Sequence, residues 1–403
     1  MEIKRSENLQ PVHSDIRGPL YLESQRMNKE GIKVLRLNTG NPATFGFGMP
    51  DSVRNALLNN ADKAVAYCDL KGMPDAREAI CNYHKSKGVQ GITPDDIYIG
   101  NGVSELVLMA LLPLLNKGDE VLMPSPSYSL WSNSTYIAGG QPVFYKCNEE
   151  NNWYPDIDDM RSKVTSKTKA IVIINPNNPT GAVYPKEVLE DIIQVAREND
   201  LLIFSDEIYD RLVMDGVKHY STAALAPDRM VITMNGLSKS HIVCGFRCGW
   251  MCISGYKGKA DDYVEGIFQI AAMRLCGNAL TQLVIPAALE DNASTQAMLV
   301  PGGRLYEQRE AVIREIDKID GLSVVKNHGA FYVFPKLDVK KFNITNDEQF
   351  ALDLLRDKHI LVTCGTGFNW KDPDHFRIVY LPNMEILKEA TAKLADFLSY
   401  YHQ

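Results

Sequence analysis

The sequence lacks the apolar runs that would place the chain in or across a membrane. Residues 1–8 carry charges where a secretory signal peptide needs an apolar core, so we expect no export. The longest segment without charges, residues 121–145, is interrupted by prolines and glycines and is rich in serine, unlike a membrane-spanning helix. We therefore expect a cytoplasmic protein with no membrane partner.

Clusters of Lys and Arg are lacking as well. The formal net charge is −7 and the isoelectric point is near 5.7, which disfavours a nucleic-acid-binding surface. Any phosphate group must then be bound by a local site. With 403 residues and 45% hydrophobic content, the chain can form a large core and two or three domains.

Cysteine is too thinly spread for a disulfide-rich secreted protein, since eight residues are scattered over the whole chain. We expect reduced thiols. Cys244, Cys248 and Cys252 recur every fourth residue and suggest a metal site, but no fourth ligand is evident and their neighbours are apolar. No metal is therefore expected, and the three cysteines are predicted to pack as small apolar side chains.

The third glycine of a dinucleotide-binding fingerprint is missing. The spacing Gly100-x-Gly102-x-x-Glu105 puts a carboxylate where that glycine permits helix–strand packing, which disfavours a nicotinamide cofactor. The segment still predicts a strand, a glycine turn and the start of a helix at residues 103–112. Free backbone N–H groups at such a helix start bind anions.

Charge is scarce between Val231 and Ile253, where only Lys239 and Arg247 are fully charged. Two short buried strands are predicted on either side of a turn, which would hold Lys239 where loss of water favours its neutral, nucleophilic amine. Lysines are mostly exposed, so this stretch alone favours a surface lysine in a loop. The rest of the chain must decide between the two.

Seven short apolar runs predict strands, and amphipathic segments such as residues 185–198 lie between some of them. The runs are residues 97–99, 120–123, 142–145, 170–174, 201–204, 230–234 and 249–253. Several show no alternation of polar and apolar residues, which is typical of strands covered on both faces. We predict an α/β fold whose large domain has a seven-stranded, mostly parallel sheet between helices.

Polar side chains follow three of these runs. Asn175–Gly181, Ser205–Tyr209 and Asn235–Lys239 each begin where a strand ends, and ligands bind at the carboxyl ends of parallel strands. Asp206 and Glu207 also suggest the carboxylate pair of a glycosidase. Adjacent residues of an extended strand face opposite ways, however, so one of the two is expected to be structural.

The character of the sequence changes beyond about residue 293, where helices alternate with strands that look antiparallel. These elements predict a smaller α+β domain. We expect an N-terminal arm and part of the small domain in residues 1–40, the large domain in 41–295 and the small C-terminal domain in 296–403. The turn at residues 38–42 is either a plain turn or a place where Gly40 lets the backbone approach a ligand.

Taken together, three motifs resemble those of the class I/II aminotransferases, which are fold-type I enzymes that use pyridoxal phosphate. The motifs are Asn175-Pro-Asn-Asn-Pro-Thr-Gly-Ala-Val183, Asp206-Glu-Ile-Tyr209, and Ser238-Lys239 followed eight residues later by Arg247. The likeness spans essentially the whole chain. It is greatest to the bacterial alanine (glutamate–pyruvate) group, through Asp15–Pro19, Ile97–Glu105, Met273–Cys276 and Gly302–Gln308.

The resemblance implies that Lys239 binds the cofactor aldehyde as a Schiff base. Once displaced by substrate, Lys239 would move a proton between the substrate Cα and the cofactor C4′. Asp206 would keep the pyridine nitrogen protonated, which sustains electron withdrawal by the ring. Asn178 and Tyr209 would donate hydrogen bonds to the ring 3′-oxygen, and Tyr128 would stack on the ring.

The resemblance also implies a set of phosphate-binding groups, namely Arg247 and the backbone of Gly102, Val103 and Ser104. Tyr67 would reach the phosphate of the partner subunit, which makes the enzyme a homodimer with shared active sites. Ser238 is a further candidate. Many relatives carry a serine where Gly236 stands, however, and this departure puts the role of Ser238 in doubt.

Arg377 resembles the arginine that grips the substrate α-carboxylate, and its planar fork suits a bidentate contact. Gly40 and Asn178 would share that carboxylate. The alternative for Arg377 is a buried structural pair with an internal acid. The alternative for Tyr67 and Tyr128 is packing in a core or interface.

The predicted reaction is ping-pong transamination, in which L-alanine and 2-oxoglutarate give pyruvate and L-glutamate. Glutamate needs a second clamp, for which Arg17 and Arg274 are candidates, with a structural role as the alternative for each. Aspartate, aromatic or branched-chain transamination and a pyridoxal-phosphate lyase or decarboxylase remain alternatives, because the protein selects which bond breaks. A non-catalytic ligand-sensing module is a third class, disfavoured because no DNA-binding segment is appended.

Overall fold

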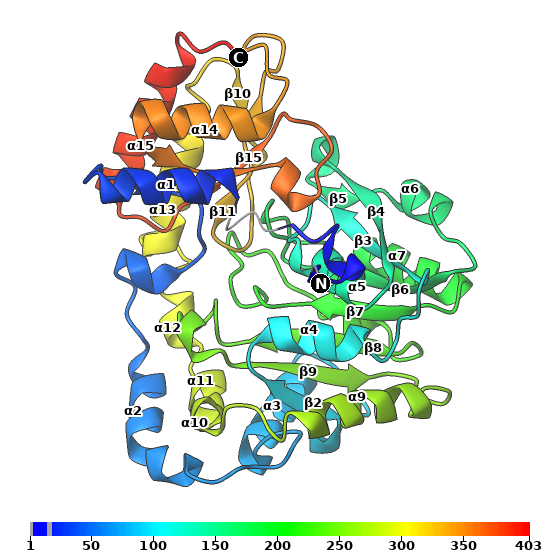
Figure 1. The fold of residues 1–403 in the computed structure, drawn as a ribbon. Coiled ribbons are helices and arrows are strands. Elements are labelled where there is room, and N and C mark those ends of the chain that lie inside the picture. The colour runs from blue at the N-terminus through cyan, green and yellow to red at the C-terminus, as the bar shows by residue number, and fades with distance from the viewer. Residues whose placement is uncertain (1–2, 14–17) are drawn as a thin grey trace.

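A mixed sheet forms the centre of the computed structural model, which describes residues 3–13 and 18–403 (Figure 1). Within these residues the sheet has eight strands, in the order β2-β9-β8-β7-β6-β3-β4-β5. They are β2 (Ile97–Gly100), β3 (Glu120–Ser125), β4 (Gln141–Asn148), β5 (Tyr154–Pro155), β6 (Thr168–Ile174), β7 (Leu202–Asp206), β8 (Val231–Gly236) and β9 (Gly249–Ser254). All seven predicted strands are present, and β5 adds a short eighth at the edge.

Strand direction brings the predicted polar segments to one edge of the sheet. β4, β3, β6, β7 and β8 are parallel neighbours, whereas β9 runs antiparallel to both β8 and β2. β2 therefore points the same way as the parallel set, and only β9 and β5 oppose it. The mostly parallel α/β sheet predicted from the sequence is confirmed. Segments that follow β2, β3, β6, β7 and β8 consequently leave the sheet on the same side.

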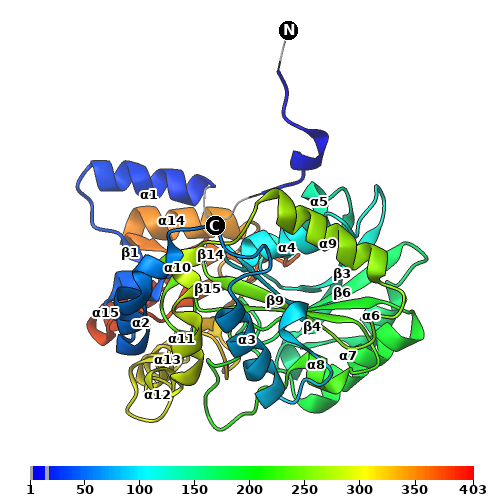
Figure 2. The same ribbon diagram turned by 90° about the horizontal axis from the view of Figure 1, so that it is seen from below.

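Helices cover both faces of this sheet (Figure 2). One face carries α4 (Val103–Leu111), α5 (Leu130–Ile137) and α9 (Asp261–Met273), and the other carries α3 (Pro74–Ser86), α6 (Ile157–Ser162), α7 (Lys186–Glu198) and α8 (Thr222–Leu225). In β6, Val172 and Ile174 pack on the first face and Ile171 and Ile173 on the second. Because both of its faces are buried, β6 has no alternation with polar residues.

A further apolar core beside the sheet combines the two ends of the chain (Figure 1). Here α1 (Pro19–Lys29) packs on α14 (Asp347–Lys358), and α13 (Arg304–Ile316) packs on α15 (Met384–Leu398). β1 (Leu35–Arg36) pairs in parallel with β13 (Ile360–Leu361). Short antiparallel ladders join β10 (Leu322–Ser323) to β12 (Lys336–Leu337), and β15 (Phe376–Val379) to both β11 (Tyr332–Val333) and β14 (Thr363–Cys364).

Four helices remain, and they lie beside and below this region in Figure 1. They are α2 (Asp51–Asn60), α10 (Ala279–Gln282), α11 (Ile285–Glu290) and α12 (Ala293–Gln296). α11 packs against both α2 and α3, while α10 contacts the 3₁₀ turn η3 (Ala61–Ala64). The domain boundaries near residues 40 and 295 stay predictions.

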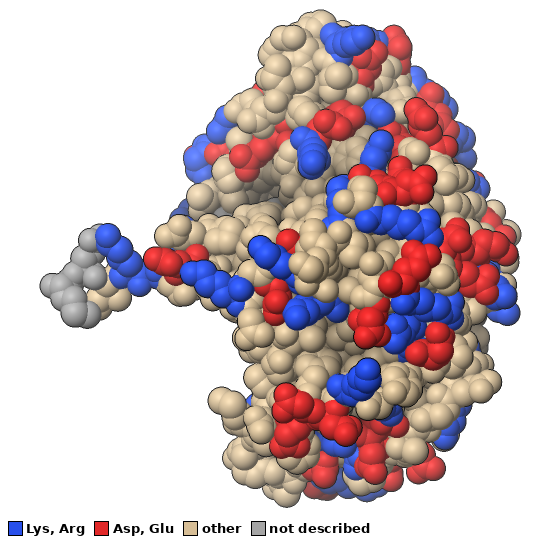
Figure 3. All heavy atoms as spheres, turned by 90° about the vertical axis from the view of Figure 1, so that its right-hand side faces the viewer, with Lys and Arg blue, Asp and Glu red and all other residues tan. Residues whose placement is uncertain are grey.

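Surface charge is mixed rather than segregated on the face shown in Figure 3. The described Lys and Arg side chains there are interspersed with Asp and Glu. In the part of the chain that the structure describes, no helix combines the length and apolar character that crossing a membrane requires.

Candidate active site

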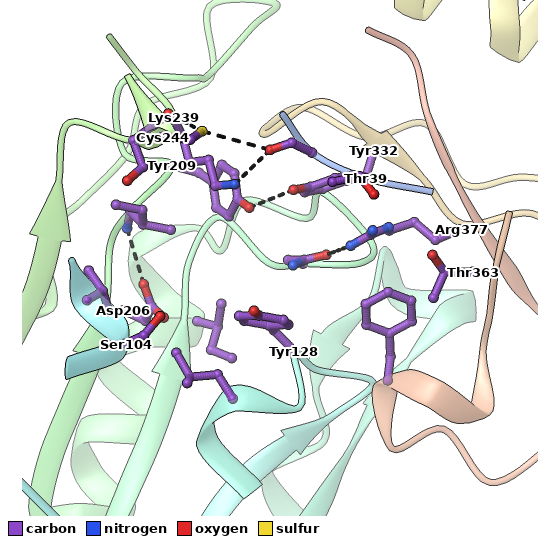
Figure 4. Close-up of a pocket in the computed structure, with 18 of the residues that line it drawn as sticks. Thr39, Ser104, Tyr128, Asp206, Tyr209, Lys239, Cys244, Tyr332, Thr363 and Arg377 are labelled. Atoms are coloured by element: carbon purple, nitrogen blue, oxygen red, sulfur yellow. Dashed lines mark hydrogen bonds between the residues drawn. The ribbon is translucent and has the colours of Figure 1, made fainter. Parts of the chain in front are cut away.

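A cavity of about 240 Å³ lies at the carboxyl edge of the sheet, between the sheet and the core formed by the two chain ends (Figure 4). The sequence predicted thirteen site residues, and eleven of them line this cavity. They are Gly40, Val103, Ser104, Tyr128, Asn178, Asp206, Tyr209, Ser238, Lys239, Arg247 and Arg377. The structure therefore gathers residues from seven separate segments around one space.

Lys239 lies in this cavity rather than on the outer surface. Its ammonium group donates a hydrogen bond to the carbonyl of Gly40 at 2.8 Å and stands 5.9 Å from the centre of the Phe331 ring. The neighbouring Ser238 and Ser240 are buried. Of the two alternatives left open for Lys239, the structure favours the interior one.

Asp206 ends β7 and turns into the cavity, where it is buried. The indole N–H of Trp131 donates to its Oδ2 at 3.0 Å, and the Ile208 N–H donates to Oδ1 at 3.3 Å. Burial raises the pKa of Asp206 to about 6, although these hydrogen bonds and the Lys239 charge oppose the shift. A buried carboxylate whose ionised form is disfavoured by burial would be stabilised by a cation that enters the cavity.

Glu207 faces away from the cavity. Its Oε1 accepts hydrogen bonds from the hydroxyls of Ser205 and Ser221 and from the Thr222 N–H, at 3.0 to 3.1 Å. Burial raises its pKa to about 7. The two adjacent carboxylates thus lie on opposite sides of the chain, as the strand geometry predicted, and they do not form a glycosidase pair.

An anion-binding cradle is formed where α4 begins. Gly102 precedes the helix with a φ of +85°, and a Cβ built there would lie 2.4 Å from a guanidinium nitrogen of Arg247. The guanidinium is anchored on its other side, where Nη1 donates to the carbonyl of Cys244 at 3.0 Å. A positive side chain and the free N–H groups of a helix start therefore converge at one point. Ser104 and Ser238 line the cavity at this end.

Arg377 occupies another side of the cavity, on β15. Its Nη1 donates to Asn178 Oδ1 at 2.8 Å and its Nη2 donates to the carbonyl of Asn38. Its planar group lies 4.4 Å from the ring centre of Tyr332 and 4.6 Å from that of Phe368. Among the described residues no carboxylate pairs with Arg377, and its buried Nε has no hydrogen-bond partner. The predicted alternative, a structural pair with an internal acid, is therefore not observed.

Two predicted candidates, Tyr67 and Arg274, lie elsewhere. Tyr67 is 81% exposed and does not line the cavity of its own chain. Arg274 forms an ion pair with Glu105 at 2.7 Å and donates to the carbonyl of Ile99 at 2.7 Å, so it is engaged in the fold. Arg17 lies outside the described residues.

The cysteine prediction is wrong for Cys244. The chain turns beside Lys239 at η6 (Cys244–Phe246), which brings the Cys244 thiol to the cavity wall, where it donates to the carbonyl of Ser238 at 2.8 Å. Cys248 and Cys252 are buried as expected. Within residues 3–13 and 18–403, no group of three His, Cys, Asp or Glu side chains is placed to hold a metal ion.

Sequence reasoning missed several residues at the cavity. Tyr332 lies in an apolar run and was not singled out, but it lines the cavity and its hydroxyl contacts the Tyr209 hydroxyl at 2.8 Å. Trp131 donates its indole N–H to Asp206 from α5, and nothing in the sequence pattern singled it out. Asn38 and Thr39 adjoin the predicted Gly40, so the turn itself was the signal for them.

Comparison with known proteins gives consistent results. Residues 32–394 match the family model described as aminotransferase class I and II. The chain is 53% identical over 399 residues to a glutamate-pyruvate aminotransferase AlaA of Haemophilus influenzae, covering 99% of each chain. It superposes on a crystal structure of an Escherichia coli aminotransferase with a TM-score of 0.99 and 49% identity, covering 100% of both chains. For an alanine aminotransferase of Pyrococcus furiosus, the TM-score is 0.93 at 38% identity, covering 98% of this chain and 100% of the other.

Proposed function

Because the chain belongs to the class I and II aminotransferases, we propose that it transfers the amino group of L-alanine to 2-oxoglutarate, giving pyruvate and L-glutamate. The observation that carries this proposal is one cavity with Lys239 on one side and Arg377, without a carboxylate partner in the described residues, on another. The first group is an amine nucleophile, and the second is a site for a substrate carboxylate.

The cavity fits pyridoxal phosphate as the cofactor. The space at Gly102 is cradled by Arg247 and the start of α4, which suits a phosphate. Asp206 is a buried carboxyl group that would pair with a protonated ring nitrogen. When bound, the cofactor supplies an aldehyde that condenses with amines and a ring that withdraws electrons from the substrate Cα.

With the cofactor bound, each of these cavity residues would have a distinct role. Lys239 would hold the cofactor through its amine and, when that amine is free, would carry a proton between the substrate Cα and C4′. Asp206 would keep the ring nitrogen protonated. Asn178 and Tyr209 would donate to the 3′-oxygen, and Tyr128 would stack on the ring. Each of these residues lines the cavity.

Phosphate and substrate binding use the remaining groups. Arg247, the backbone of Gly102, Val103 and Ser104, and the hydroxyl of Ser238 would hold the phosphate. Arg377 would bind the α-carboxylate of alanine, together with Gly40 and Asn178. The ring faces beside Arg377 exclude water from that contact, which strengthens it.

We further propose a cytoplasmic homodimer in which Tyr67 of each chain completes the phosphate site of the other. Its 81% exposure in the single chain supports this role. The division into a large domain of residues 41–295 and a small domain built from both chain ends belongs to the same proposal. Pairing of β1 with β13 supports it.

A half-reaction panel tests the substrate assignment. The protein, loaded with pyridoxal phosphate, is given one amino acid at a time while the visible band of the bound cofactor is recorded. L-Alanine and L-glutamate should bleach the band, and alanine alone should release one equivalent of pyruvate per site without ammonia or carbon dioxide. A band that responds to another donor but not to these two would refute the alanine assignment, and release of ammonia would favour a lyase.

A further inference from the structure

Tyr332 lies where the proposed cofactor site and the proposed carboxylate site meet. It starts β11, which pairs with β15 so that Tyr332 stands opposite Val379, two residues from Arg377. Although only 2% exposed, the side chain lines the cavity. Figure 4 shows it between Tyr209 and Arg377.

The hydroxyl of Tyr332 has one hydrogen-bond partner among the described residues, the hydroxyl of Tyr209 at 2.8 Å. The two rings meet edge to face, with centres 5.7 Å apart. Burial raises the pKa of Tyr209 well above its ordinary value, so Tyr209 keeps its proton at neutral pH. When two hydroxyls share one hydrogen bond, the acceptor's own proton is left for another partner. If Tyr332 is the donor, that remaining proton belongs to Tyr209 and faces the cavity.

The ring of Tyr332 has a separate contact. The Arg377 guanidinium lies 4.4 Å from its centre, and Phe368 stands 4.6 Å from the same guanidinium. Aromatic contacts of this kind restrict the plane of a guanidinium. The plane decides whether both outer nitrogens can reach one carboxylate.

The turn at Gly40, whose carbonyl contacts Lys239, also packs against Tyr332. A Cβ at Gly40 would lie 2.3 Å from the Tyr332 hydroxyl, so that turn passes directly against it. The Gly40 carbonyl in turn accepts the hydrogen bond from Lys239. Tyr332 therefore contacts a residue on each side of the proposed reaction centre.

We propose that Tyr332 is a positioning residue for transamination: its hydroxyl donates to Tyr209, which leaves the Tyr209 proton for the cofactor 3′-oxygen, and its ring sets the plane of Arg377 for the substrate carboxylate. This inference rests on the proposed function. It assigns one side chain two separable tasks, one for the hydroxyl and one for the ring.

The hydroxyl task is tested with Tyr332→Phe, by titrating the visible band of the lysine-bound cofactor against pH. A weaker donor at Tyr209 leaves the 3′-oxygen more basic, so the pKa of the bound cofactor should rise by about 0.7 unit, the equivalent of one ordinary hydrogen bond. In a Tyr209→Phe background the same change should have no effect, because Tyr332 acts through Tyr209.

Tyr380→Phe is the matched control. Tyr380 is equally buried in the same core, its hydroxyl donates to the carbonyl of Ala330 at 3.0 Å, and it does not line the cavity. Loss of that hydroxyl should lower the melting temperature without moving the titration. Equal shifts for Tyr380→Phe and Tyr332→Phe would overturn the inference, because both would then reflect loosened packing.

The ring task is tested with Tyr332→Leu. We expect the KM for alanine to rise at least about tenfold beyond that of Tyr332→Phe, because only the leucine variant releases the plane of Arg377. An unshifted titration in Tyr332→Phe, or an equal KM in the two variants, would overturn the corresponding half of the inference. A wild-type protein that takes up no cofactor would instead overturn the proposed function, and this inference with it.

Discussion

Lys239 and Asp206 reach the cavity from the ends of neighbouring strands, yet removing each should have a different effect. In Lys239→Ala the phosphate cradle and ring contacts remain, so pyridoxal phosphate should still bind. Turnover should fall by roughly 10²- to 10⁴-fold or more, because no group is left to carry the proton. Lys218→Ala is the control, since Lys218 stands over the Tyr220 ring outside the cavity. Multiple turnovers by Lys239→Ala would contradict the assignment.

Asp206 should make the stability of the cofactor-free protein depend on pH. Its pKa is about 6 in the folded protein against an ordinary value of 3.8, so the folded state favours the protonated acid. This contribution is fully present below about pH 4 and is lost as the pH rises through 6. Relative to Asp206→Asn, the wild type should lose about 3 kcal/mol of unfolding free energy between pH 4 and pH 7.

Denaturant unfolding of both proteins across this range measures the difference. The titration of Glu207 is common to the two proteins and cancels in the comparison. A difference that stays constant with pH would show that Asp206 is ionised throughout.

Some of the residues at the cavity could be predicted from the sequence, and others could not. Lys239, Asp206 and Asn178 were predictable because each follows an apolar strand, and parallel strands end at one edge. Tyr332 was not, because a tyrosine inside an apolar run has the same signature whether it packs in a core or borders a cavity. The misplaced Cys244 has the same cause, since its position depends on a turn that composition does not encode.

At the scale of elements, the start of α4 is the predicted phosphate site, and Gly102 is its most sensitive position. Gly102→Ala places a methyl group against Arg247 and also strains a φ of +85°. The dissociation constant for pyridoxal phosphate should rise about tenfold or more, since a charge-assisted contact is lost. Titration of the cofactor-free protein with pyridoxal phosphate measures this change.

Gly118→Ala separates the two effects of that substitution. Gly118 has a similar φ of +91°, but nothing lies within 4 Å of a Cβ there. The variant should lose about 1 kcal/mol of stability through backbone strain and keep its cofactor affinity. Equal loss of affinity in both variants would show that strain, not the Arg247 contact, is responsible.

A buried ion pair holds the ends of β7 and β8 and helix α3 together on the side away from the cavity. The Lys87 ammonium pairs with Asp210, whose carboxylate also accepts from Tyr83 at 2.6 Å and Asn235 at 2.9 Å. Burial opposes ionisation of Asp210, but the Lys87 charge outweighs it and holds the pKa of that carboxyl well below its usual range. Asp210→Asn or Lys87→Met alone should each cost about 3 to 5 kcal/mol, because one buried charge loses its partner.

The double variant provides the check on this pair. Removing both charges should recover much of the loss, since neither is then left uncompensated. Arg26→Ala is the control, because the exposed Arg26 side chain pairs with Glu23 and Glu30, and its loss should leave the unfolding free energy almost unchanged. Additive losses in the double variant would argue that the two residues act independently.

At the scale of the whole molecule, the proposed homodimer predicts that a second copy covers some of the exposed apolar side chains. Val65 is 87% and Met273 83% exposed, near Tyr67, and α10 packs on η3 between their segments. Exposed apolar side chains that cluster on a surface mark protein–protein contacts. The wild type should therefore sediment as a dimer of about 90 kDa, twice the chain mass of 45.1 kDa.

Met273→Glu should shift this protein toward the monomer and weaken cofactor binding, because Tyr67 of the second chain is then absent. Leu22→Glu changes another exposed apolar residue, on α1, and should leave the dimer intact. Analytical ultracentrifugation distinguishes the two. A dimer that persists in Met273→Glu would place the interface elsewhere.

The overall architecture was predictable in its class and in seven of the eight sheet strands, but not in the short edge strand β5 or the strand order. Seven apolar runs alternating with helices suffice to predict a mostly parallel sheet, because that pattern has few other solutions. The reversed direction of β9 and the pairing of β1 with β13 depend on contacts distant in sequence, which periodicity does not report. The predicted domain boundaries remain open for the same reason.

The β1–β13 pairing also has a consequence for how the protein is made. Leu35 and its partner Ile360 are far apart in the chain, and at about 5 to 20 residues per second the ribosome needs roughly 15 to 65 s to deliver the second strand. The carbonyl of Asn38 accepts a hydrogen bond from Arg377, so that bond cannot form until Arg377 has been synthesised. Asp206, Lys239 and Arg247 are synthesised well before that. Under the proposed function, the groups that would bind the cofactor therefore all precede, in the order of synthesis, the arginine that would bind the substrate carboxylate.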